Sequence, residues 1–267
     1  MANYLDKSNI ERQPLKNNFL KRVIIRFDFT SIVNMQSVLD NIVAYLQSLK
    51  ESFGSFDQMT APQEEIEKYG GLGNGDNKED RPFIYRFSDC QIEPKQDVTL
   101  DFARNYLCMD IRCNGQYYLI DSYLNIMKAL ASIIIDSDRF VRLERIGIRK
   151  IDGIDAIDPS DANNVFEYFS QKLAWGDSDR MKARQYTDYM ICDDLPAYVN
   201  YSRIVRVIPG ENKLLRFTLD IDCYKDSKIL EKRPDNNTIA TYLDSMNKKL
   251  FDLFIMGIKL EYLNQNL

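Results

Sequence analysis

The stretch that decides the fold reads RVIIRFDF at residues 22–29 and, after a short connection, MQSVLDNIVAYLQSLK at residues 35–50. Apolar residues occupy every second position of the first segment, which is the pattern of a strand with one buried face. In the second segment they recur every three or four positions, as in a helix that lies on a sheet. The two segments therefore predict a strand followed by a helix.

The same order of elements occurs twice: strand, helix, three strands, helix. The first pass runs from residue 22 to 136 and the second from 139 to 263. We expect further strands at 83–88, 97–104, 106–113, 139–151, 184–192, 198–208 and 214–224, and further helices at 122–136, 161–173 and 238–263. A short fragment supports a duplication, because DIRC at 110–113 and DIDC at 220–223 hold the same place in the two passes.

These patterns predict an α+β fold made of a tandem β-α-β-β-β-α pseudo-repeat around a pseudo-twofold axis. The halves would be residues 19–137 and residues 138–267, the second ending in the long helix. We expect antiparallel sheets with helices packed on one face and a more polar opposite face.

Residues 54–82 interrupt the pattern with many glycines, two prolines and scattered charges, and we expect a long loop there. The run GGLGNGD at 70–76 could suggest a phosphate-binding loop. It lacks the Gly-Lys-Ser/Thr that follows in such loops, and no strand leads into it, so we do not assign that role.

The composition limits the possible chemistry. The 267 residues are 45% hydrophobic and 28% charged, which is typical of a globular protein. A net charge of −5 argues against a nonspecific nucleic-acid binder. The chain has no histidine, which excludes Ser-His-Asp and Cys-His catalysis and imidazole zinc sites. Any acid–base chemistry would need carboxylates, lysine, tyrosine or cysteine.

The five cysteines indicate a reducing compartment. Their number is odd and none forms a C-x-x-C pair, so we expect buried, reduced thiols. The polar segment 1–18 has no apolar core of signal-peptide length, and no apolar run of membrane-spanning length occurs. We therefore expect a cytoplasmic protein that does not associate with membranes.

The candidate binding residues lie on two strands that carry charges on one face. In 214–224, alternate apolar residues point inward and polar residues outward. In 139–151 the arginines share a face with Val141 and Leu143, so this strand is either covered on both sides or shifted in phase by a bulge. If the two strands are neighbours, arginines meet aspartates across the open face. The candidate residues are Arg145, Arg149, Arg216, Asp220 and Asp222.

Three interpretations of this face stay open. It could be a cross-strand ion-pair ladder that serves only the fold, or a groove for an anionic ligand or acidic peptide. Asp220 and Asp222 could also share a magnesium ion, although nuclease sites usually need a third acid, and Lys225 points away from Asp222. The acids that recur every third residue in 152–161 lack the alternate spacing of an EF-hand calcium loop. We assign no metal ligands.

Residues 142–151, RLERIGIRKI, resemble the signature of an uncharacterised, sporadically distributed bacterial family of about this length, which carries an Arg-Ile-Gly-Leu-Arg-Tyr-Ile-Asn-like segment. A Leu-Asp-Ile-Asp strand before a long last helix, here at 219–222, is similar as well. This chain has Lys150 where the family tends to have Tyr and Asp152 where it tends to have Asn, and it lacks the histidine usual in the last helix. The resemblance implies no catalytic residue. A patchy distribution of this kind fits mobile or host-defence (antiviral) gene neighbourhoods.

No catalytic constellation emerges, and we assign neither catalytic residues nor a cofactor. The leading hypothesis is a cytosolic bacterial interaction or regulatory module that binds a protein partner, or a second copy of itself, through the open sheet face or the 54–82 loop. One alternative is a small-anion or nucleotide sensor that uses Arg145 and Arg149. Another is a magnesium-dependent hydrolase or nuclease that uses Asp220 and Asp222.

Overall fold

The computed structural model describes residues 19–49, 52–60, 83–92, 96–113, 120–157, 165, 183–192, 195–208 and 214–262. The elements up to residue 137 are β1 (Leu20–Phe29), α1 (Met35–Ser48), β2 (Phe53–Thr60), β3 (Phe83–Cys90), β4 (Asp97–Ala103), β5 (Tyr106–Arg112) and α3 (Asp121–Ser137). The later elements are β6 (Leu143–Ile157), β7 (Ala183–Cys192), β8 (Ala197–Val207), β9 (Leu215–Asp226) and α5 (Asn236–Gly257).

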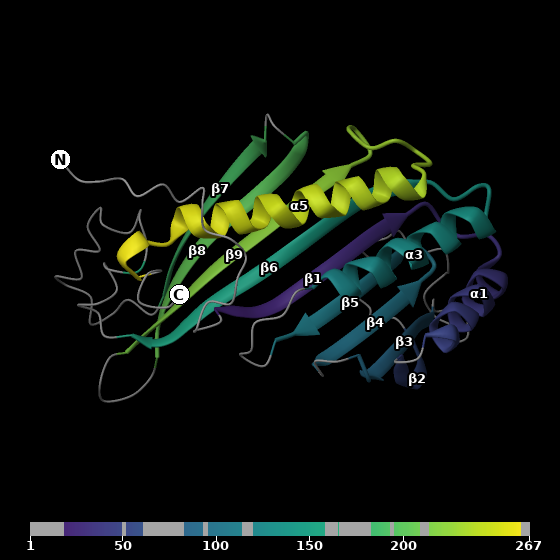
Figure 1. The fold of residues 1–267 in the computed structure, drawn as a ribbon, viewed down its shortest axis with the longest axis horizontal. Helices are drawn as coiled ribbons and strands as arrows, with labels where there is room; N and C mark the ends of the chain where they lie inside the picture. Colours follow the sequence, from purple (N-terminus) through teal and green to yellow (C-terminus); the bar gives the residue numbers. More distant parts are fainter. Residues whose placement is uncertain are drawn as a thin grey trace, which may run out of the picture.

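The strands form one nine-stranded sheet in the order β2-β3-β4-β5-β1-β6-β9-β8-β7. Every neighbouring pair is antiparallel. The chain is therefore an α+β protein with antiparallel strands, and the described strands form a single sheet where we expected antiparallel sheets without predicting their number. The reason is that β1 and β6 lie side by side at the middle, so each covers the edge that the other would otherwise leave free (Figure 1).

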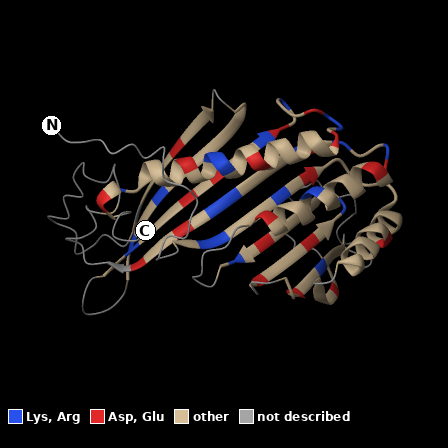
Figure 2. Cartoon of the chain, viewed as in Figure 1, with Lys and Arg blue, Asp and Glu red and all other residues tan. Residues whose placement is uncertain are grey.

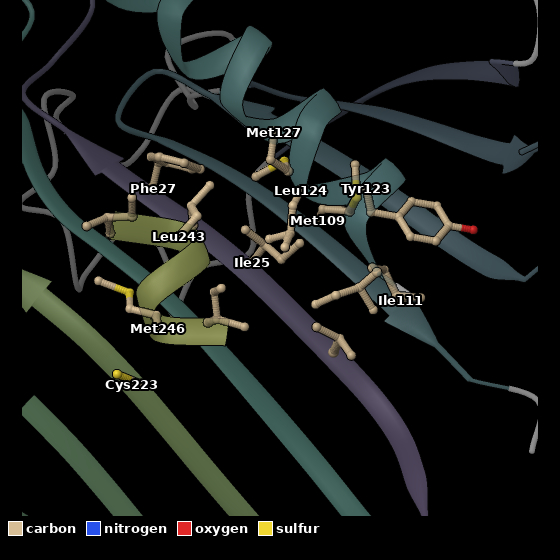
Figure 3. Packing of buried hydrophobic residues seen from close by; sticks show 14 of the residues in the cluster. Ile25, Phe27, Met109, Ile111, Tyr123, Leu124, Met127, Cys223, Leu243 and Met246 are labelled. Carbon is tan, nitrogen blue, oxygen red and sulfur yellow. The ribbon is translucent and has the colours of Figure 1, made fainter. Parts of the chain in front are cut away.

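The hydrophobic core lies between the sheet and the helices α1, α3 and α5, which pack on the same face (Figure 1). The alternation read in residues 22–29 places the odd-numbered residues of β1 in this core, and Ile25 and Phe27 are fully buried. Figure 3 shows their side chains between the sheet and residues of α3 and α5, including Leu124 and Leu243. The periodicity of the sequence thus fixes which face of the sheet is apolar.

Several predicted bounds change. β2 occupies the start of the expected loop, so that prediction is wrong for 54–60; the rest of the loop, the glycine run at 70–76 and the expected helix 161–173 lie outside the described residues. β6 begins later and ends later than 139–151, and α5 ends at Gly257 rather than 263. A Cβ at Gly257 would overlap the hydroxyl of Tyr201, so only glycine permits this close approach.

The phase problem in the first strand of the second half is resolved by a bulge. Phe29 pairs with Leu143, whereas the preceding residue Asp28 pairs with Arg145, so one residue of β6 is extra at this point. Leu143 therefore faces the core while Arg145 lies on the opposite face.

All five cysteines are free thiols. Cys90, Cys192 and Cys223 are buried as expected, but Cys108 and Cys113 are only half-buried. Among the helices of the described residues, none is long and apolar enough to cross a membrane.

Candidate binding surface on the open face of the sheet

The face of the sheet opposite the helices carries rows of charged side chains from six adjacent strands. We call this set the open-face ladder, and it consists of Arg86, Asp101, Asp110, Arg22, Arg26, Asp28, Arg145, Arg149, Asp220 and Asp222. Figure 2 shows both acidic and basic positions on β1, β6 and β9. These charged residues alternate with the core residues along each strand. The same period of two that places apolar side chains in the core therefore places the charged side chains on the opposite face.

Three pairs of the ladder are bidentate. The Nε and Nη2 atoms of Arg86 each donate to Asp101 at 2.7 Å. Arg22 binds Asp110 in the same way, at 2.7 and 2.6 Å, across β1 and β5. Two parallel charge-assisted hydrogen bonds fix the plane of each guanidinium, so these side chains hold one orientation.

The third bidentate pair joins two predicted site residues. Arg149 on β6 donates from Nε and Nη2 to the two carboxylate oxygens of Asp220 on β9, at 2.7 and 2.5 Å. Its side chain stays 46% exposed, whereas that of Asp220 is 14% exposed. The hydrogen bond to Asp220 is the main cause that raises the pKa of Arg149, against the opposing effect of desolvation. The arginine presents a charged, oriented edge to solvent.

Arg145 lies at the centre of the ladder. Its Nη2 donates to Asp222 at 3.0 Å, and its Nη1 is 3.9 Å from Asp28 on β1. Its guanidinium also lies 4.6 Å from the ring centre of Tyr224, within range of a cation–π contact. Burial raises the pKa of Asp222, and the nearby Arg145 and Arg149 oppose that effect. One arginine thus connects the halves of the sheet.

The contacts of residue 147 explain why the Arg-Ile-Gly-Ile-Arg segment has a glycine at its centre. Gly147 pairs with Tyr224 across β6 and β9. A Cβ added there would lie 2.9 Å from the Tyr224 Cβ and 3.3 Å from the Cys223 carbonyl oxygen. The glycine therefore leaves the space in which Tyr224 lies beside Arg145.

A second arginine–tyrosine contact continues the ladder across β1. Arg26 donates from Nε to Asp28 at 2.7 Å, and its guanidinium lies 4.5 Å from the ring centre of Tyr106 on β5. Asp28 in turn faces Arg145. A connected polar and aromatic path therefore crosses β5, β1, β6 and β9.

The structure brings four of the five predicted site residues together and separates the fifth. Arg145, Arg149, Asp220 and Asp222 form two neighbouring pairs on β6 and β9, as the two-strand argument predicted. Arg216 lies apart, near the start of β9, where it pairs with Asp155.

Sequence reasoning missed the part of the ladder contributed by β1. The alternation already placed Arg26 and Asp28 on the face opposite the core. What it did not reveal is that β1 pairs with β6, and that pairing places Asp28 beside Arg145. The outward charges of β1 could have predicted contacts with β6 only if the order of the strands had been known.

The residues proposed for magnesium are engaged elsewhere. Asp220 and Asp222 accept hydrogen bonds from Arg149 and Arg145, and among the described residues no group of three or more acids or cysteines could hold a metal ion. Lys225 lies on the helix face, as predicted; it is 2% exposed and donates to the Pro196 carbonyl oxygen at 2.6 Å. The arrangement favours ion pairing over metal binding.

A separate polar cluster is buried on the helix face. Lys150 donates from Nζ to Asn247 of α5 at 2.7 Å, and Asp152 follows two residues later on β6 with 8% of its surface exposed. Desolvation raises the pKa of Asp152 to about 7, with Lys150 opposing this and Asp220 adding to it. Burial likewise raises the pKa of Cys113 to about 12. This cluster affects stability more directly than binding, because it lies under a helix.

The sequence matches no protein-family model and no curated protein. The resemblance seen in residues 142–151 therefore stays a prediction, and the argument for function depends on the geometry of the open-face ladder.

Proposed function

We propose that this chain is a cytosolic bacterial interaction or regulatory module that binds a protein partner through the open-face ladder. The observation that carries the proposal is a set of arginines held in one orientation by carboxylates and tyrosine rings, on the face opposite the helices. Arginine and tyrosine are enriched among the residues that dominate binding energy at interfaces. Side chains that are already fixed also lose less entropy when a partner binds.

The paired state of the arginines supports a protein partner over a small anion. Arg149 and Arg145 already have carboxylate partners in Asp220 and Asp222, so a free phosphate would have to replace a carboxylate of the protein. A partner protein can instead contact the exposed edges of both members of a pair. The small-anion or nucleotide sensor remains the alternative, and stabilisation of about 3 kcal/mol by one nucleotide at 100 times its Kd, in a thermal-shift panel, would favour it.

A magnesium-dependent hydrolase or nuclease is the third hypothesis. It requires Asp220 and Asp222 to leave their arginines and converge on one cation. Metal-dependent cleavage that is lost in Asp222→Asn would support it, and equal activity of the two proteins would remove it.

We also propose that the chain is a tandem repeat with halves 19–137 and 138–267, related by a pseudo-twofold axis between β1 and β6. The strand order supports this, because β1, β5, β4 and β3 follow one another outward on one side as β6, β9, β8 and β7 do on the other. The helices α3 and α5 each follow the last strand of their half. A host-defence gene neighbourhood would fit the resemblance of the 142–151 segment.

A charge swap separates recognition from folding. Arg149→Asp alone breaks the bidentate pair with Asp220 and should lower the free energy of unfolding by about 1 kcal/mol. Adding Asp220→Arg restores a pair of reversed polarity, and with it most of the stability. If a partner protein binds the ladder, the double variant should no longer capture the protein that wild type enriches from native cytosol. Its melting temperature should stay close to that of the wild type.

The matched control is the pair of Lys128 and Asp244, which joins α3 to α5 at 2.9 Å on the helix side. Its charge swap should leave capture unchanged. Capture of the same protein at the same level by the wild type and both swapped variants would show that the ladder serves only the fold.

A further inference from the structure

The β7 strand forms one edge of the sheet and, among the described strands, pairs only with β8 (Figure 1). Every second residue of an edge strand directs its N–H and C=O groups away from the sheet. β7 has ten residues, ARQYTDYMIC, with neither proline nor lysine among them. Natural proteins commonly use these two residues to protect an edge from pairing. The backbone of β7 is therefore a long edge that suits another strand.

Two large apolar side chains of β7 are exposed on the open face. Tyr189 is 80% exposed and Ile191 is 70% exposed. Tyr189 and Ile191 are two residues apart in β7, so their side chains lie on the same face of the sheet. Their partners in β8 are Asn200 and Tyr198. Two such side chains beside an unprotected edge are a feature of strands that pair with another chain.

The opposite edge is different. In β2 the ring of Phe56 stacks on Tyr85 at 6.1 Å and lies 5.1 Å from Phe87, so this aromatic packs against its own sheet. The neighbouring exposed residues Ser55 and Asp57 are polar. Phe56 is 49% exposed, against 80% for Tyr189 and 70% for Ile191, so among the described residues the apolar exposure is greater at the β7 edge.

We propose that β7 pairs antiparallel with β7 of a second copy of this chain, around a twofold axis that passes through Tyr189. An axis perpendicular to the sheet keeps both open faces on the same side, so odd-numbered residues face odd-numbered residues. The axis at Tyr189 places the two tyrosines opposite each other and Thr187 opposite Ile191. Asp188 then faces Met190, so no like charges oppose each other.

Two registers displaced toward the start of β7 fit less well. An axis at Asp188 would place two aspartates directly opposite each other, which is destabilising. An axis at Thr187 would place Tyr189 opposite Gln185 and Ile191 opposite Ala183, which loses the aromatic pair. Aromatic cross-strand pairs stabilise a sheet, so the register at Tyr189 is preferred over these two. This pairing is independent of the partner proposed for the open-face ladder.

Light scattering on the purified full chain tests the pairing. The wild type should elute with twice the 31.2 kDa mass of one chain. Tyr189→Lys with Ile191→Lys should be monomeric and still folded, with an unchanged far-UV circular dichroism spectrum, because both side chains are exposed. Val33→Lys with Met256→Lys, at positions 67% and 56% exposed, should stay dimeric. A monomeric wild type, or a dimer that survives the β7 lysines, overturns the proposal.

Cysteine cross-linking tests the register. Tyr189→Cys should form a disulfide-linked dimer under mild oxidation, because the two Cβ atoms would lie within about 5 Å. Ile191→Cys should not, since position 191 faces position 187 of the other copy. Burial raises the pKa of the native Cys108 and Cys113 thiols to about 12, so these compete poorly. Equal cross-linking of both variants would overturn the register. Neither result changes partner capture by the open-face ladder, so each proposal can fail alone.

Discussion

Replacing Asp152 with asparagine should reshape the pH dependence of stability. Asp152 is 8% exposed and lies on the helix face of β6, near the Lys150 amine that donates to Asn247. Desolvation is the main reason why its pKa rises from 3.8 to about 7 in the folded state. Asparagine has nearly the same size and shape as aspartate, so the substitution should also be well tolerated sterically.

The direction of the change in stability with pH depends on whether Asp152 ionises first in the folded or in the unfolded chain. The unfolded chain releases the Asp152 proton near its ordinary pKa of 3.8, whereas the folded chain holds it until about pH 7. The stability that the protonated carboxyl provides is therefore complete below about pH 4 and is lost as the pH rises to 7. A pKa raised this far corresponds to a free energy on the order of a few kcal/mol, which is large enough to measure in an ordinary domain.

Urea unfolding measured between pH 4 and pH 9 is the assay. The difference in unfolding free energy between Asp152→Asn and wild type should grow in favour of the variant as the pH rises, and level off above pH 7. Asp155→Asn is the control, because Asp155 is exposed and pairs with Arg216. This control removes an exposed carboxylate from the same strand, so it should not reproduce the difference expected for Asp152→Asn. A profile for Asp152→Asn that runs parallel to that of the wild type would show that folding does not raise the pKa of Asp152.

Two glycine substitutions test the close contacts that the fold requires. Gly147→Ala should lower the free energy of unfolding by about 1–3 kcal/mol, because the new Cβ would lie 2.9 Å from the Tyr224 Cβ. Gly153→Ala is the control, because its new Cβ would meet a flexible lysine side chain. It should lower the free energy of unfolding by less in the same urea titration. Gly257→Ala should lower the melting temperature by several degrees, since its Cβ would overlap the Tyr201 hydroxyl, and Tyr201→Phe in the same chain should recover part of the loss.

The core and most strands could be predicted from the sequence because periodicity reports burial directly. The alternation in residues 22–29 placed Val23, Ile25 and Phe27 in the core, and all three are fully buried. The phase conflict between Leu143 and Arg145 also suggested a bulge, which the register shift confirms.

β2 could not be predicted in this way. Its residues are mostly exposed, so they carry no apolar alternation, and its backbone pairing with β3 defines it as a strand. The ends of β6 and α5 depend on tertiary contacts, such as the approach of Tyr201 to Gly257, which leave no periodic signal.

The part of the candidate site on β6 and β9 could be predicted, because both strands were recognised in the sequence. The part on β1 could not, because it depends on the order of the strands in the sheet. Arg145, Arg149 and their aspartates share outward faces in the sequence pattern, and the ladder confirms that they meet. The contribution of Asp28 follows from the pairing of β1 with β6, a long-range contact that a single sequence does not encode in any local spacing.

Photo-cross-linking from position 24 in native cytosol would show whether a protein binds the open-face ladder. Ile24 lies on the open face of β1, between Asp110 and Arg149 in the strand register, and Asp252 on the exposed side of α5 is the control position. A photoreactive residue at position 24 should link to one specific protein partner, and the same residue at position 252 should not. No specific product at position 24, or the same products from both positions, would contradict the proposed function.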